Sequence, residues 1–260
     1  MSGDLMGMDA TAWRRATGRG VRVLVVDSGV ETSHPIFAGK AIAAFVAQMD
    51  ERGFRHVAPE AAVDPSGHGT AVAGIIHAFA PEAELASVRV MSEIGGSSLL
   101  VIAALHWAID QGYHVVNCSF TSADARFLPE YKSVVDRAFC RNVAIVAACN
   151  NRNYGAVEYP GSFPTVISTD FGKLDGLTLH RRPGELVEFV AAGELVSVAF
   201  KNGQSRLMTG SSVAAPHVSA LVARLRELRP EWNVCQIKSA MYEMAMSVTG
   251  LGGDPCPRSC

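Results

Sequence analysis

The chain has 260 residues and a formal net charge of −2, and its composition is 48% hydrophobic and 18% charged. This size suits one α/β domain with a large core, so we expect a single domain over residues 1–260, with peripheral tails at about 1–15 and 250–260. The near-neutral charge offers no basic surface for nucleic acid, and no apolar run has the length of a membrane span.

Apolar runs of strand length alternate along the chain with helical patterns. The runs are Val21–Val26, Ala41–Ala47, Leu85–Met91, Val115–Phe120, Val143–Cys149, Thr165–Thr169 and Leu186–Ala191. The helical patterns are Thr70–Phe79, Ser98–Gln111, Pro129–Cys140 and the apolar stretch from Gly210 to Leu228. This alternation predicts a three-layer α/β fold, a parallel β-sheet flanked by helices, whose ligands bind at the carboxyl ends of the strands.

Polar residues stand where several of these elements begin or end. Asp27 closes the first run, and His68 lies between two glycines at the start of a helical pattern. Asn150 follows the run at Val143–Cys149, and two serines precede the helical stretch after Gly210. Taken singly, the aspartate and asparagine are typical of turns and the serines of helix caps. The glycines around His68 favour a functional histidine, because they admit a close approach of backbone or substrate.

Together the motifs resemble the subtilisin-like serine proteases (subtilases), over about Ala10 to Val248. The resemblance depends on Val26-Asp27-Ser-Gly-Val, on Gly67-His68-Gly-Thr-Ala-Val-Ala-Gly74, on Ala147-Ala-Cys-Asn150 and on Gly210-Ser-Ser212-Val-Ala-Ala-Pro-His217. The order aspartate, histidine, serine is also that of the family.

The resemblance implies a role for each matching residue. Ser212 is expected to be the nucleophile, His68 the general base, and Asp27 the residue that orients His68. Asn150 is expected to donate its side-chain amide to the oxyanion, together with the backbone N–H of Ser212. No metal or cofactor is expected in this chemistry.

The resemblance also implies a binding cleft for extended peptide. Ser119, Phe120 and Thr121 are expected to pair with substrate on one side, and Gly95 and Gly96 on the other, by β-strand addition. Cys149 stands where the family usually has glycine, so its side chain is expected to narrow the pocket for the residue before the scissile bond.

Two expectations concern the segment around Glu158. By resemblance, the Tyr159–Pro160 bond is expected to be cis, and Glu158 to lie at the base of the primary specificity pocket. A carboxylate there would favour Arg or Lys immediately before the scissile bond. The alternatives are that the loop at residues 151–157 turns Glu158 to solvent, or that Arg152 neutralises it.

The resulting hypothesis is a serine endopeptidase, and the finer expectation is a dedicated peptide-maturation or leader-processing protease. A peptide ligase or macrocyclase on the same scaffold, and a pseudoprotease that binds peptide without cutting it, remain as alternatives. The expected partner is an extended peptide or protein substrate, with no nucleic acid and no membrane; no pattern indicates the oligomeric state.

The N-terminal residues and the cysteines give expectations about the cellular compartment of the protein. The N-terminus lacks the basic start and apolar core of a secretory signal, which favours the cytoplasm; secretion stays open if the natural protein begins further upstream. No two of the six cysteines have Cys-x-x-Cys spacing. Cys256 and Cys260 lie in a proline-rich tail, where a disulfide or metal site is disfavoured.

Overall fold

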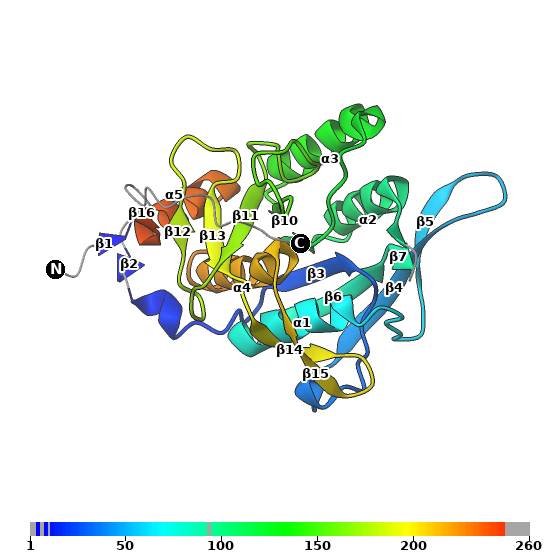
Figure 1. The fold of residues 1–260 in the computed structure, drawn as a ribbon, viewed down its shortest axis with the longest axis horizontal. Coiled ribbons are helices and arrows are strands. Elements are labelled where there is room, and N and C mark those ends of the chain that lie inside the picture. Colours follow the sequence, from blue (N-terminus) through cyan, green and yellow to red (C-terminus); the bar gives the residue numbers. More distant parts are fainter. Residues whose placement is uncertain (1–3, 6–7, 10, 93–94, 248–260) are drawn as a thin grey trace.

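A ten-stranded, mostly parallel sheet forms the centre of the computed structural model, which describes residues 4–5, 8–9, 11–92 and 95–247 (Figure 1). The strand order is β16-β12-β13-β11-β10-β9-β3-β6-β4-β5. The seven strands from β13 to β4 are parallel, whereas β5 and β12 pair antiparallel with their neighbours β4 and β13. The predicted fold class is confirmed.

The strands of this sheet are β3 (Arg22–Asp27), β4 (Ile42–Met49), β5 (Arg55–Pro59), β6 (Glu84–Arg89), β9 (Val115–Cys118), β10 (Ala144–Ala148), β11 (Ile167–Gly172), β12 (His180–Arg181), β13 (Phe189–Ala192) and β16 (Met246–Ser247). Three small antiparallel pairs are β1 (Asp4–Leu5) with β2 (Met8–Asp9), β7 (Met91–Ser92) with β8 (Gly95–Gly96), and β14 (Val196–Phe200) with β15 (Gln204–Met208). The helices are α1 (His68–Phe79), α2 (Ser98–Asp110), α3 (Leu128–Cys140), α4 (Ser211–Leu228) and α5 (Val234–Met244), with 3₁₀ turns at Ala12–Arg14, Pro35–Phe37 and Ala125–Phe127.

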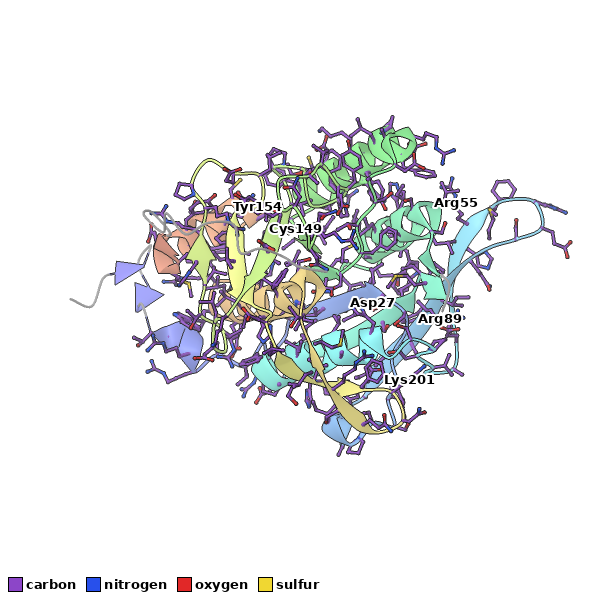
Figure 2. The ribbon with its side chains drawn as sticks, in the orientation of Figure 1. Asp27, Arg55, Arg89, Cys149, Tyr154 and Lys201 are labelled. Atoms are coloured by element: carbon purple, nitrogen blue, oxygen red, sulfur yellow. The ribbon has the colours of Figure 1, made fainter. Side chains whose placement is uncertain are left out.

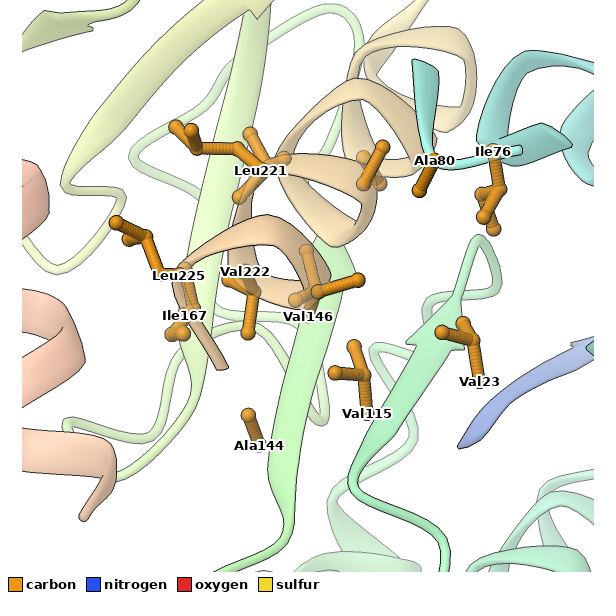
Figure 3. Close-up of a cluster of buried hydrophobic side chains, with 14 of the residues drawn as sticks. Val23, Ile76, Ala80, Val115, Ala144, Val146, Ile167, Leu221, Val222 and Leu225 are labelled. Atoms are coloured by element: carbon orange, nitrogen blue, oxygen red, sulfur yellow. The ribbon is translucent and has the colours of Figure 1, made fainter. Parts of the chain in front are cut away.

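The alternation of side chains along the strands divides the core into two layers. In β3, Val23 and Val25 pack in one cluster with residues of α1, α4 and α5, and Leu24 and Val26 pack in another with α2 and α3. Figure 3 shows part of the first cluster, in which Leu221, Val222 and Leu225 of α4 lie over strands β9, β10 and β11. Because both faces are covered, the central strands are largely apolar, with a few buried polar residues such as Asn117 of β9.

The strand ends place the polar motifs at one edge of this sheet. β3, β9 and β10 are adjacent and parallel, so Asp27, Ser119 and Cys149 stand at or just after three neighbouring carboxyl ends. α1 and α4 pack against each other and begin at His68 and Ser211. The motifs that lie far apart in sequence are therefore gathered by the topology itself.

Several details differ from the sequence-based expectation. The run at 186–191 becomes a strand only from Phe189, and the run at 165–169 is shifted to Ile167–Gly172. The hairpins β4–β5 and β14–β15, and helix α5, were not anticipated. The Tyr159–Pro160 bond is cis, as predicted.

The described part of the chain contains no helix that combines the length and the apolar character needed to cross a membrane. Among its cysteines, Cys118, Cys140, Cys149 and Cys235 are free. The expectations for Cys256 and Cys260, and for the tail at 250–260, lie outside the described residues.

Candidate active site

The carboxylate of Asp27 is fully buried at the end of β3. Its Oδ1 accepts a hydrogen bond from the backbone N–H of Ser28 at 2.7 Å and lies 2.7 Å from Nδ1 of His68. A carboxylate on Nδ1–H holds the imidazole in the tautomer whose Nε2 is free to accept a proton. The pair can therefore act as an oriented base.

The loop before α1 positions His68. The buried carboxylate of Asp64 accepts from the N–H of Gly67 at 2.8 Å, and from the N–H and hydroxyl of Thr70 at 2.7 and 2.6 Å. A Cβ on Gly69 would lie 2.0 Å from the carbonyl oxygen of Gly29, so only glycine fits beside the histidine. The start of α1 is thus tied down before any substrate is bound.

The first turn of α4 carries Ser211 and Ser212, which differ in their surroundings. Ser211 is 1% exposed, and its hydroxyl donates to the carbonyl of Cys149 at 2.6 Å and lies 2.8 Å from Oδ1 of Asn151. Ser212 is partly exposed and shares a cavity of about 300 Å³ with His68. Ser211 is therefore a structural hydroxyl, and Ser212 is the accessible one.

This cavity, called the site cavity below, joins residues from six separate segments of the chain. It is lined by Ser28, Ser66, His68, Met91, Ser119, Thr121, Ala148, Cys149, Asn151, Ser211 and Ser212. Figure 2 labels Asp27 at the end of β3 and Cys149 just after β10. A larger cavity, of about 850 Å³, lies between the β4–β5 hairpin, α2 and α3, and none of the candidate catalytic residues lines it.

The structure places the two consecutive asparagines in different surroundings, and neither is thereby shown to be the oxyanion donor. The Nδ2 of Asn150 donates to Oε1 of Glu158 at 2.7 Å, and Asn150 does not line the site cavity. Asn151 does line it, and its Oδ1 accepts from the backbone N–H of Ser211 at 2.7 Å. Because Oδ1 is occupied at α4, the amide Nδ2 remains as the donor that can serve a ligand near Ser212. The only sequence signal for this residue was a second asparagine after the strand.

Only some of the residues expected to bind substrate line the site cavity. Ser119, Thr121 and Cys149 line the site cavity, whereas Phe120 packs in the core near α2 and lies where a Cβ on Gly96 would be 2.6 Å from its ring. Gly95 and Gly96 form the short strand β8. The ring of Phe120 thus lies against Gly96, and the pairing of a peptide between β8 and the segment after β9 stays a prediction.

Cys149 is not a competing nucleophile. Its thiol is buried and lies 3.5 Å from Oδ1 of Asp170. Burial, and then the charge of Asp170, raise the pKa of the Cys149 thiol far above its usual range. Near neutral pH the sulfur is protonated and hence unreactive.

The surroundings of His68 predict the pH dependence of any reaction that needs its neutral form. The charge of Asp27 raises the pKa of His68, against the opposing effect of burial. As pH falls through this raised pKa, His68 gains a proton and can no longer act as a base. We expect kcat/KM to fall on the acid side with an inflection above about 6.5, the value of a free histidine.

Steady-state measurement of kcat/KM over a range of pH checks this expectation. Asp27→Asn removes the charge that raises the pKa, so its residual activity should show an inflection at lower pH. An inflection at or below that of a free histidine in the unchanged protein would contradict the assignment.

Comparisons with known proteins agree with the geometry. A family model described as the subtilase family matches residues 18–255. M-protease of Shouchella clausii (strain KSM-K16) is 32% identical over 252 residues, which cover 92% of this chain and 62% of that protein. Subtilisin Savinase of Lederbergia lenta is 31% identical over 248 residues, which cover 90% of this chain and 87% of that protein.

The fold is also found among solved structures. The structure titled Sphericase superposes with a TM-score of 0.73 at 25% sequence identity, covering 90% of this chain and 88% of that one. The chain thus spans less than two thirds of the length of M-protease and most of the length of the other two.

Proposed function

The chain belongs to the subtilase family, and on this premise we propose that it is a serine endopeptidase that hydrolyses peptide bonds through an acyl-enzyme on Ser212. The observation that carries this proposal is the hydrogen bond of 2.7 Å between His68 and Asp27, in a cavity that His68 shares with Ser212. An oriented base beside an accessible serine is the arrangement that activates a hydroxyl for attack.

In the proposed reaction, Oγ of Ser212 attacks the substrate carbonyl while Nε2 of His68 takes the hydroxyl proton. Asp27 stabilises the imidazolium that forms. His68 then returns the proton to the leaving amine as the C–N bond breaks, and a water molecule releases the acyl group by the same steps in reverse.

The negative charge that develops on the substrate oxygen needs hydrogen-bond donors. The N–H of Ser212 lies in the first turn of α4, where backbone N–H groups have no partner within the helix. We assign the second donor to Nδ2 of Asn151, because its Oδ1 is held by Ser211 at 2.7 Å. Two such donors, fixed in advance, stabilise the oxyanion without reorganisation.

The proposal is tested by incubating the purified protein with a library of linear peptides and analysing the products by mass spectrometry. Two linear fragments whose masses sum to that of the substrate plus one water indicate hydrolysis. Joined ends with the loss of water would indicate a ligase or macrocyclase instead. Unchanged peptides, with binding detected, would identify a pseudoprotease. A dedicated role in peptide maturation stays a prediction.

The segment around Glu158 predicts the cleavage preference. Tyr159 forms an antiparallel backbone bridge with Ser122, so Glu158 lies opposite residue 123, two residues beyond Thr121 of the site cavity, and does not itself line that cavity. The neutral amide of Asn150 binds Oε1, and Oε2 is buried with no partner among the described residues. No ion pair of Glu158 with Arg152 is found in the described part of the chain; Arg152 instead donates its backbone N–H to Asn150.

We therefore expect Glu158→Gln to lower kcat/KM for substrates with Arg or Lys before the scissile bond by ~10- to 100-fold. Substrates with an apolar residue at that position should be cleaved as before or faster, because they no longer meet an unpaired charge. Cleavage profiles of both proteins on one peptide library measure the effect. The same profile for both would refute the role of Glu158.

A further inference from the structure

A polar side chain is buried within the central strand β9. Asn117 is 0% exposed and has apolar neighbours on both sides in the chain. Its Nδ2 donates to the hydroxyl of Ser119 at 2.9 Å, and its Oδ1 accepts from the hydroxyl of Ser219 at 2.9 Å. An unpaired amide in the core would cost several kcal/mol, so both ends of this side chain are used.

The hydroxyl of Ser119 leads on to the proposed nucleophile. It donates to the backbone carbonyl of Ser212 at 3.1 Å. In an α-helix this carbonyl would accept from the N–H four residues further on, but that residue is Pro216, which has no N–H. Ser119 thus supplies the hydrogen bond that the proline removes.

The directions of these hydrogen bonds fit one arrangement. Ser119 gives its single hydroxyl proton to Ser212, so it must accept from Asn117, which requires the amide Nδ2 to face it. The other end of the amide then faces the hydroxyl of Ser219 as an acceptor. Ser219 lies about two turns along α4 from Ser212, on the same face. Asn117 therefore holds α4 at two points.

We propose that Asn117 is a positioning residue, which fixes the first turn of α4 through Ser119 and Ser219 and so sets the placement of Ser212 relative to His68. This inference rests on the proposed function. The side chain of Asn117 touches neither the site cavity nor the substrate path. Its effect would be on the geometry of attack, to which rates are sensitive: a misplacement of ~1 Å can cost about 100-fold.

The test compares Ser119→Ala, Ser219→Ala and Asn117→Ala with the unchanged protein. We expect kcat to fall by ~10- to 100-fold in Ser119→Ala and Asn117→Ala, with KM and the acid inflection of the pH profile unchanged. Because Asn117 acts on Ser212 through Ser119, kcat of the double variant Asn117→Ala/Ser119→Ala should be little lower than that of Asn117→Ala alone. Ser219→Ala should lower kcat by a smaller factor.

Ser87→Ala is the matched control. Ser87 is a buried strand serine of β6 whose hydroxyl has no partner among the described residues, so its loss should leave kcat unchanged. If Asn117→Ala does not fold, Ser119→Ala and Ser219→Ala test the positioning role instead, since each removes only one hydroxyl. Unchanged kcat in both, with a lowered melting temperature, would show a purely structural network and overturn the inference.

Labelling by a fluorophosphonate separates this inference from the proposed function. Fast labelling of the unchanged protein and slow labelling of Ser119→Ala support the positioning role. Equal rates for the two proteins refute the positioning role alone. Failure to label the unchanged protein refutes the proposed function, and with it the inference.

Discussion

Replacing Ser212 by alanine is expected to lower kcat by roughly 10⁶-fold, the scale of loss for a nucleophile that acts as one unit with its base. The variant should fold normally, because Ser212 is partly exposed. Its backbone carbonyl, which accepts from Ser119, is unchanged. Steady-state hydrolysis and thermal unfolding of the same preparation measure both effects.

His68→Ala should cost nearly as much as Ser212→Ala, and the double variant little more, because neither residue catalyses without the other. Ser211→Ala is the matched control. The Ser211 hydroxyl is committed to Cys149 and Asn151, so its loss should lower the melting temperature while leaving measurable turnover. Full activity in Ser212→Ala, together with a loss in Ser211→Ala, would reverse the assignment of the two serines.

Asn151→Ala is expected to lower kcat by ~10²- to 10³-fold with little change in KM, the usual cost of losing one oxyanion donor. The reason is that Nδ2 of Asn151 is the side-chain amide placed at the site cavity. Asn150→Ala serves as the comparison, since that amide donates to Glu158 instead, and it should lower kcat by less than about tenfold.

The same kinetic assays decide between the two asparagines. A large fall in kcat for Asn150→Ala, and a small one for Asn151→Ala, would restore the assignment made from sequence. Ser211 loses a partner in Asn151→Ala, so the melting temperature of each variant should be measured beside its kcat. A fall in kcat well below the melting transition then reports the loss of the donor.

The sequence could predict the architecture because the central strands are buried on both faces. Their near-continuous apolar runs, such as Val21–Val26 and Val143–Cys149, are visible without a structure. Each functional motif is attached to the end of such a run or to the start of a helix. For parallel strands, this is enough to place the motifs at one edge.

The sequence could not fix the position of the asparagine. Two asparagines follow each other at 150 and 151, and consecutive residues in extended chain point in different directions. Which of them faces Ser212 depends on where the strand ends, and β10 ends at Ala148. Contacts with α4 decide which of the two side chains points towards that helix. Such long-range contacts leave no pattern in the residues around 150 and 151.

The hairpins β4–β5 and β14–β15 were not predicted, for a different reason. In β5 and β15 most residues are exposed, so neither strand has an apolar run or a clear alternation. Their pairing is determined by β4 and β14 beside them. Helix α5 carried a signal that was missed: Asn233 and Gln236 form a capping box at its start.

The most direct test of the central claim is covalent labelling of the purified protein with a fluorophosphonate, followed by peptide mapping. The account predicts one modified residue, Ser212, and no modification in His68→Ala. The rate of labelling should fall at acid pH as His68 gains its proton. Modification at Ser211, equal labelling of His68→Ala, or no labelling of an otherwise folded protein would contradict the account.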